Sequence, residues 1–317
     1  MRPGRRAGRA RRLPGHRRRG GDQVSIAVAK TYKLYVGGTF PRSESGRTYQ
    51  VTDAGGSFMA NAVLASRKDA RDAVVAARKG FGSWSKATPY NRGQVIYRIA
   101  EMLQSRQPEF VELLITSRGV DRAEAAAEVD AAIDRLVHFA GWTDKLTAVF
   151  GSANPVSAPY FNYSAPEPTG VVAVIAPADA PLLGLVSVIA PVITGGNACV
   201  VIAAEADPCV AITFGEVLAT SDVPAGVVNI LTGIAAEIAP HLAAHADVNA
   251  LDLTGTDAEL ARDLEVAAAG TVKRVYRPRG RPDFRAAPGT VRLRSFLEIK
   301  TVWHPTGAPS LAGGSSY

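Results

Sequence analysis

The sequence predicts an α/β protein with a Rossmann-like, doubly wound parallel sheet. Two observations lead to this class. In the second half of the chain, short apolar runs rich in β-branched residues alternate with helical patterns, an order typical of an open parallel sheet. The chain also has 317 residues, of which 47% are hydrophobic and 21% charged, so it can bury a sizeable core.

The N-terminal half is predicted to begin with a small sheet and to continue as helices. Residues 32–40 (YKLYVGGTF) alternate around a Gly-Gly turn, which is typical of an edge strand or a hairpin. The residues SRKD from Ser66 form a capping box with Asp in the place of Glu, and they predict a helix start. Further helices are expected from Pro89, over 108–118 and over 121–146, the longest amphipathic run.

The parallel sheet is predicted from four apolar runs that helical segments separate. The strands are expected at 171–175, 199–202, 227–231 and 250–253, and the helices at 182–193, 210–219 and 235–244. Beyond them, residues 273–285 hold six cationic residues with Gly and Pro breaks, so an exposed connection is expected. Residues 291–303 (VRLRSFLEIKTVW) alternate over their length and predict one long strand.

The net charge of +7 belongs to the N-terminus and not to the body of the protein. Residues 1–21 contain nine of the 36 Lys and Arg and no acidic residue, so the rest of the chain carries 27 cationic against 29 acidic residues. This segment is predicted to be a disordered basic tail over 1–24. A misplaced translation start or a simple solvated tail is the preferred explanation; binding to nucleic acid or an anionic surface, and an organellar address, are the alternatives.

The sequence predicts a cytoplasmic protein without a membrane segment. No apolar run long enough for an export signal follows the basic stretch. The most apolar segment, 170–195, is divided by Pro177, Asp179, Pro181 and Pro191 into pieces too short to cross a bilayer. The chain has only two cysteines, which suits a reducing compartment.

Several motifs together resemble the aldehyde dehydrogenase superfamily over roughly four-fifths of the chain. The matching pieces are YVGGTF, AARKGFGSW, APADAPLL, GGNACVV, PAGVVNILTG and LTGT followed by an acid. Residues 151–164 are similar to the family's oligomerisation hairpin, and FLEIKTV near the C-terminus is similar to the terminal strand that pairs with it. The resemblance implies a cofactor domain with a small oligomerisation β-extension.

The resemblance also implies NAD(P)-dependent oxidation of an aldehyde through a thiohemiacetal on a cysteine, for which this chain lacks room. The family's catalytic domain lies between LTGT and the terminal strand, where a domain needs on the order of 100 residues or more. We therefore expect a cofactor-type domain over 25–150 and 165–272, an oligomerisation sheet over 151–164 and 289–305, and a connection over 273–288 in place of the catalytic domain. A flexible tail is expected over 306–317.

The three catalytic functions that the family needs are not found in the sequence. Neither Cys199 nor Cys209 matches the position of the nucleophile. Asp179 stands where the family has an Asn that donates to the oxyanion, and an ionised carboxylate has no donor. Pro278 stands where the family has its general base, and proline cannot take a proton. The sequence thus predicts no catalytic residues.

The cofactor positions are partly kept. The family's ribose-binding Lys and Glu correspond to Ile202 and Glu205, so only the acid remains. Gly233 ends the PAGVVNILTG run, and Gly255 and Thr256 correspond to the turn on the pyrophosphate side, where small residues at a helix start can approach a phosphate. NAD or NADP is thus the cofactor that the resemblance implies.

The other candidate ligand sites in the sequence are weak. Glu237, His241 and His245 lie at helical spacing, but the Glu of a zinc-protease helix does not follow His241. We expect no metal site there. The connection over 273–285 has few stacking aromatic residues, so nucleic acid is not expected as a partner.

Three hypotheses follow from the sequence. The first is a non-catalytic subunit or scaffold that assembles with itself or with a full-length aldehyde dehydrogenase paralogue. The second is an NAD(P)-dependent aldehyde oxidoreductase that a partner subunit completes. The third is nucleic-acid binding by the arginine-rich tail, which predicts binding that is lost when residues 1–21 are removed.

Overall fold

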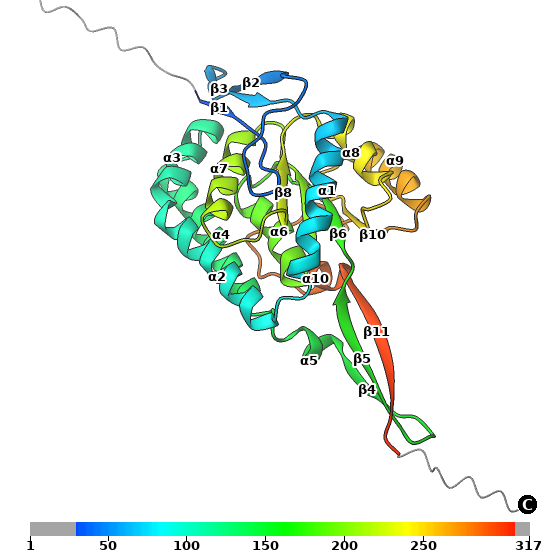
Figure 1. Cartoon of the computed structure of the whole chain (residues 1–317). Helices are drawn as coiled ribbons and strands as arrows, with labels where there is room; N and C mark the ends of the chain where they lie inside the picture. The colour runs from blue at the N-terminus through cyan, green and yellow to red at the C-terminus, as the bar shows by residue number, and fades with distance from the viewer. Residues whose placement is uncertain (1–29, 308–317) are drawn as a thin grey trace, which may run out of the picture.

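The computed structural model describes residues 30–307 and has the predicted doubly wound parallel sheet at its centre (Figure 1). Five parallel strands stand in the order β10-β9-β6-β7-β8. They are β6 (Val171–Ile175), β7 (Ala198–Ile202), β8 (Val228–Leu231), β9 (Ala250–Asp252) and β10 (Arg274–Tyr276). The predictions for the basic tail 1–24 and for nearly all of the tail 306–317 lie outside the described residues.

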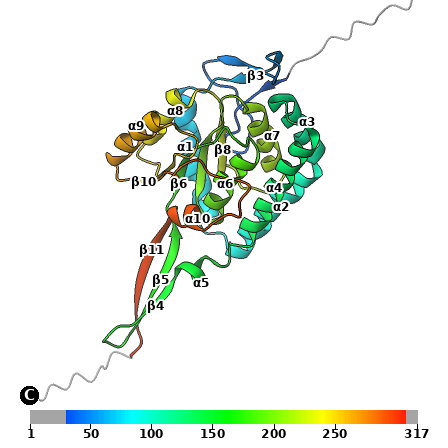
Figure 2. The same ribbon diagram turned by 180° about the vertical axis from the view of Figure 1, so that it is seen from behind.

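Helices cover both faces of this sheet, as the views from the front and from behind show (Figures 1 and 2). One face is covered by α1 (Arg67–Trp84), α8 (Ala235–Ala243) and α9 (Ala258–Ala269). The other is covered by α2 (Pro89–Ser105), α3 (Gln107–Arg118), α4 (Arg122–Ala140), α6 (Leu183–Thr194) and α7 (Pro208–Ala219). Because side chains alternate along a strand, Val171 and Ala173 pack under α1 and α8, whereas Val172 and Val174 pack under α6, which α4 covers in turn.

The first helix begins as the capping box predicts. The Ser66 hydroxyl accepts the backbone N–H groups of Lys68 and Asp69, and the Asp69 carboxylate accepts the N–H of Ser66 at 2.7 Å. A shorter side chain in the Glu position therefore completes the same reciprocal cap.

A small sheet precedes the helices, with β1 (Thr31–Tyr32), β2 (Thr48–Thr52) and β3 (Phe58–Val63) in the order β1-β3-β2. After β1, Val36 and Thr39 form a tight turn, and Tyr35 bridges to Ile230 of β8. The expected strand or hairpin at 32–40 is thus a short strand, a turn and one bridge, which attach the N-terminal residues to the edge of the central sheet.

A three-stranded antiparallel sheet extends away from the body (Figure 2). It contains β4 (Ser152–Asn154), β5 (Tyr160–Pro168) and β11 (Leu297–Pro305), and the short helix α5 (Leu146–Phe150) leads into it. We call residues 151–168 and 297–305 the β-arm. β11 pairs with β5 over nine residues, from Leu297 opposite Pro168 to Pro305 opposite Tyr160, so the pairing expected between the hairpin and the terminal strand is present.

The prediction of one long strand over 291–303 is wrong in its first part. Val291–Ser295 form a short helix, α10, and the strand begins only at Leu297. Leu293, Phe296 and Leu297 are all buried, and their spacing of three and four residues is that of one helix face. Alternation over five residues therefore does not distinguish a strand from one turn of helix.

The connection expected over 273–285 contains the fifth strand of the central sheet. The Arg274 N–H donates to the Asn249 carbonyl at 3.1 Å, and the Leu253 N–H donates to Tyr276 at 2.9 Å. An edge strand can carry exposed arginines, and Arg274 pairs with Glu298 of the β-arm. The amphipathic run 121–146 also ends earlier than predicted, because α4 stops before Gly141.

Candidate functional site

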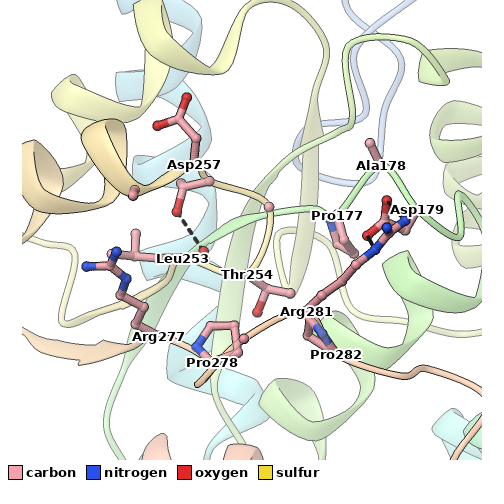
Figure 3. A pocket seen from close by; sticks show the side chains of 14 residues that line it. Pro177, Ala178, Asp179, Leu253, Thr254, Asp257, Arg277, Pro278, Arg281 and Pro282 are labelled. Atoms are coloured by element: carbon pink, nitrogen blue, oxygen red, sulfur yellow. Dashed lines mark hydrogen bonds and ion pairs between the residues drawn. The ribbon is translucent and has the colours of Figure 1, made fainter.

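A cavity of about 470 Å³ lies at the carboxyl end of the central sheet (Figure 3). Three segments line it: the loop after β6, the turn after β9 and residues 277–282 after β10. Ligands of doubly wound sheets bind outside the carboxyl ends of the strands, and the volume is in the range of small-molecule sites. This cavity is the candidate site, and it brings together Asp179, Gly255, Thr256 and Pro278.

The turn at Gly255 packs directly against the end of β6. The Gly255 N–H donates to the Ile175 carbonyl at 2.9 Å, and a Cβ added to Gly255 would lie 2.1 Å from the Ala176 oxygen. Only glycine fits this close approach. Next to it, the Thr256 hydroxyl donates to the Leu253 carbonyl at 2.7 Å.

The N-terminus of α9 faces the same cavity but carries its own carboxylate. Asp257 accepts the N–H groups of Glu259 at 3.1 Å and Leu260 at 2.8 Å. A phosphate at this helix start would have to share or displace that cap. The turn thus has the small residues of a phosphate-binding turn, with a competing negative charge beside them.

An arginine from the connection binds Asp179, the aspartate that the resemblance assigns to the family's oxyanion position. Arg281 donates to both carboxylate oxygens of Asp179, from Nε at 2.7 Å and from Nη2 at 2.6 Å (Figure 3). The pair is bidentate, but Arg281 is 77% exposed, so it adds little to stability. Its chemical effect is clear: Asp179 remains an acceptor and offers no donor to a developing oxyanion.

A general base is also not apparent in this cavity. Pro278 lines it with Arg277, and neither side chain can accept a proton at neutral pH. Among the described lining residues, the carboxylates are Asp179, held by Arg281, and Asp257, which caps α9. The arrangement can bind a polar ligand, but it lacks a free group for proton abstraction.

The two cysteines are buried and are not activated as nucleophiles. Cys199 lies within β7 and Cys209 in the first turn of α7, and both are almost fully buried. Burial raises the pKa of each thiol to about 12. For Cys209 the nearby Asp207 carboxylate also raises the pKa. Because the thiolate is the reactive form, neither thiol is activated at neutral pH.

The other two predicted cofactor residues lie elsewhere on the carboxyl edge. Glu205 follows β7 and is exposed, while Gly233 follows β8 and is buried with a positive φ of 132°. The Tyr49 hydroxyl donates to the Glu205 carbonyl at 3.2 Å. Burial raises the Tyr49 pKa, the Glu205 charge adds to this, and a hydrogen bond with the Gly233 backbone opposes it. The structure therefore divides the predicted residues into Gly255 and Thr256 at the cavity and Glu205 and Gly233 beside Tyr49.

The sequence did not reveal what holds the connection over the sheet. Arg135 of α4 is buried and donates to the Ser187 hydroxyl at 2.7 Å, to the Phe284 carbonyl at 2.6 Å and to the Ala286 carbonyl at 3.1 Å. The Phe284 ring is itself packed into the main core. A buried arginine on an amphipathic helix was the available signal, since such a residue needs partners.

A second arginine fixes the end of the connection. Arg292 of α10 forms an ion pair with the fully buried carboxylate of Asp252 and donates to the Thr254 hydroxyl at 2.7 Å. Its guanidinium also lies 4.5 Å from the Tyr276 ring centre. The segment between β10 and β11 is therefore anchored in its middle by Arg135 of α4 and near its C-terminal end to Asp252, at the carboxyl end of β9.

Within residues 30–307, no group of three or more His, Cys, Asp or Glu is arranged to hold a metal ion. None of the helices in this part of the chain combines the length and apolar character needed to span a membrane.

The fold and the cavity define a protein of the Rossmann-like α/β class with a ligand cavity at the strand ends. The chain belongs to the aldehyde dehydrogenase family, whose sequence model matches residues 40–278. The protein DhaS of Bacillus subtilis (strain 168) is 32% identical over 249 residues, which are 77% of this chain and 50% of DhaS. The cytosolic 10-formyltetrahydrofolate dehydrogenase of Xenopus tropicalis is 31% identical over 79% of this chain and 28% of its own length.

Solved structures agree with this assignment. The NAD+ complex of an aldehyde dehydrogenase from Bacillus cereus superposes with a TM-score of 0.73 at 25% identity, and the match covers 78% of this chain and 50% of that one. HpcC from Thermus thermophilus also gives 0.73, at 28% identity over 78% of this chain and 47% of its own. The chain thus spans about half the length of DhaS and of these two solved proteins, and 28% of the Xenopus tropicalis enzyme.

Proposed function

We propose that this protein is a non-catalytic member of the aldehyde dehydrogenase family, a cytoplasmic subunit or scaffold that assembles through its β-arm. The observation that carries the proposal is the cavity itself. Asp179 is bound by Arg281, Pro278 stands at the position of the base, and both thiols are buried with a raised pKa. A thiohemiacetal mechanism needs a thiolate, an oxyanion donor and a base.

The β-arm supports the assembly part of the proposal. Two of its strands pair over nine residues, yet it extends from the body with large hydrophobic side chains in contact with solvent. These exposed side chains are Tyr160, Phe161, Tyr163, Ile299 and Trp303. A narrow sheet with solvent on both faces is marginally stable on its own, and grouped apolar residues indicate a contact surface.

The partner is a second copy of this chain or a full-length aldehyde dehydrogenase. In either case, the central sheet with its helices is the cofactor-type unit, the β-arm is the assembly sheet, and residues 277–290 are the segment in place of a catalytic domain. The anchoring of that segment by Arg135 and Arg292 supports a stably folded unit.

We also propose that the protein binds NAD or NADP, the cofactor implied by the family and present in the Bacillus cereus complex. The residues fit such a ligand in part. Gly255 and Thr256 leave room for a phosphate, and the Glu205 side chain is exposed and can accept from a ribose hydroxyl. The cation of the ribose site is replaced by buried Ile202, and Asp257 caps the adjacent helix. Weak binding is therefore expected.

The alternative is an NAD(P)-dependent aldehyde oxidoreductase whose catalytic residues come from a partner subunit. The cavity of about 470 Å³ at the carboxyl end of the sheet, which has room for a ligand, favours this second candidate. It requires the partner to supply the thiolate and the base, because the described part of this chain offers neither at the cavity.

Co-expression with a full-length aldehyde dehydrogenase, followed by size-exclusion chromatography with light scattering, tests the assembly. We expect a self-assembled species or a mixed species that contains both chains. Two separate peaks together with a monomeric protein would refute the proposal. Calorimetric titration of the same samples with NAD+ and NADP+ tests the cofactor, and NAD(P)-dependent turnover of an aldehyde by an inactive partner complexed with this chain would favour the alternative.

A further inference from the structure

We infer that the free edge of β11 pairs antiparallel with the same edge of a second copy of this chain, around a two-fold axis at Thr301. This inference rests on the proposed assembly through the β-arm and names its partner and its register. The sheet order β11-β5-β4 leaves one side of β11 unpaired among the described residues. An edge of this length exposes backbone N–H and C=O groups that can pair with another strand.

Two backbone hydrogen bonds identify which groups the free edge presents. At one end of the ladder the Thr169 N–H donates to Phe296 at 3.3 Å, and at the other the Thr306 N–H donates to Pro159 at 2.9 Å. Both lie in the register of β11 with β5. Hydrogen-bonded pairs alternate along an antiparallel ladder, so the even-numbered residues of β11 face β5. Ile299, Thr301 and Trp303 therefore point their backbone groups toward the free edge.

This edge has little of the protection that monomeric proteins give to edge strands. The ladder of β11 with β5 continues without a bulge. The Lys300 ammonium lies 3.0 Å from the Glu167 carboxylate on β5 and therefore does not cover the free edge. A proline occurs only at the last residue, Pro305, where it removes an outward donor. Bulges, guarding lysines and central prolines are the usual means of blocking an edge.

The side chains favour one register. With the axis at Thr301, exposed Ile299 lies opposite Trp303 of the second copy; these side chains are 49% and 58% exposed in the monomer. Glu298 then lies opposite His304, and Lys300 opposite Val302, so no like charges meet. The outward N–H groups of Ile299, Thr301 and Trp303 also meet the carbonyls of Trp303, Thr301 and Ile299 in the other chain.

The neighbouring registers are less favourable. An axis at Lys300 places the two Lys300 ammonium groups directly opposite each other. An axis at Val302 places Lys300 opposite His304 and leaves Ile299 opposite Pro305. Like charges in directly opposed positions destabilise a strand pair, which disfavours the first register, and the second register loses the contact between Ile299 and Trp303. The Thr301 register is therefore the favoured one.

Site-specific cross-linking tests the register. In the Thr301→Cys variant the two new cysteines are directly opposed at a distance that a disulfide spans, so mild oxidation should give a covalent dimer in high yield. The matched control is Lys300→Cys, whose cysteines are diagonal neighbours about 7–8 Å apart and should not cross-link. Native Cys199 and Cys209 are buried and do not interfere. Cross-linking at 300 in place of 301 would overturn the register.

A proline variant tests the edge independently. Thr301→Pro removes an N–H that points away from β5, so the intramolecular ladder should survive while the dimer dissociates in light scattering. Lys300→Pro, the control, removes a ladder donor and should lower the unfolding temperature. If Thr301→Pro leaves self-association unchanged and Thr301→Cys forms no disulfide, the inference is overturned. The proposed assembly would then use another surface. A protein that associates only with a full-length paralogue would also overturn it, whereas the absence of both associations would refute the proposed function.

Discussion

Replacing Arg135 with methionine should loosen the segment that occupies the place of a catalytic domain. Arg135 is 8% exposed and has no carboxylate partner among the described residues. Its guanidinium instead satisfies the Ser187 hydroxyl and the carbonyls of Phe284 and Ala286. Methionine has a similar length and no charge, so the change removes the donors while keeping most of the packing volume.

The expected loss can be worked out from these contacts. A buried acceptor without its partner costs about 1–3 kcal/mol, and the bonds to Ser187 and Phe284 are buried, whereas the bond to Ala286 is only partly so. Burial lowers the Arg135 pKa, which shows that the charged form is penalised in the folded protein. Removing that charge offsets part of the loss. A net decrease of about 2–4 kcal/mol in the free energy of unfolding is therefore expected.

Urea unfolding of the full chain measures this quantity, and hydrogen exchange locates it. Peptides covering 277–290 should exchange faster in Arg135→Met, while those of the central strands change less. Arg285→Ala is the matched control: Arg285 is 58% exposed and lies 3.9 Å from Glu124, so its removal should change stability by less than about 0.5 kcal/mol. A loss of stability below about 1 kcal/mol for Arg135→Met, without faster exchange in 277–290, would refute the role of Arg135 in holding this segment.

Three further outcomes are expected. The raised pKa of about 12 for Cys199 and Cys209 predicts that neither thiol reacts with an alkylating reagent at pH about 8 until the protein is unfolded; rapid labelling of the native protein would contradict this. Asp179→Asn, which introduces the residue that the resemblance implies at this position, should free Arg281, change stability by less than about 1 kcal/mol and produce no aldehyde oxidation in a reduced-cofactor assay, because the nucleophile is still missing. Glu128 of α4 accepts the backbone N–H groups of Leu182 and Leu183. Burial outweighs these bonds and raises the Glu128 pKa above 4.5, so the folded state holds that proton more tightly than the unfolded state. The stability of the wild type relative to Glu128→Gln should then fall as the pH rises through 4.5 and beyond, and a pH-independent difference in urea unfolding would contradict the assignment.

The regular part of the fold could be predicted because local pattern and burial agree there. The strand at 171–175 is apolar throughout since both of its faces are covered by helices, and the cap at Ser66 follows from residue chemistry alone. These features depend on neighbours in the sequence or on the two sides of one sheet.

The elements after Gly270 could not be predicted in this way, because long-range contacts decide them. Arg274–Tyr276 become a strand through pairing with β9 and the ion pair with Glu298. Val291–Ser295 become helical because Leu293 packs beside Leu146 and Leu297. The distant partners, β9 for Arg274–Tyr276 and Leu146 for Leu293, are not close in sequence, and the local alternation of residues 291–303 favoured the wrong element.

The candidate site was predicted in composition more than in arrangement. Asp179, Gly255, Thr256 and Pro278 line one cavity. They follow β6, β9 and β10, whose carboxyl ends lie at the same edge of the parallel sheet. The capture of Asp179 by Arg281 depends on the path of the connection, which no local pattern encodes. The roles of Glu205 and Gly233 in cofactor binding stay predictions.

A single-turnover experiment tests the central claim most directly. The full chain, in molar excess over NAD+ or NADP+, is mixed with a panel of aldehydes while the absorbance of the reduced nicotinamide is followed. Since the cavity has no thiolate and no free base among its described residues, and Asp179 offers no donor at the position that the resemblance assigns to the oxyanion-binding Asn, we predict no burst of reduced cofactor on any timescale of the assay. A burst with an amplitude that matches the concentration of bound cofactor would contradict the account, because a trace contaminant gives a slow rise whose rate scales with its amount and no such stoichiometric burst.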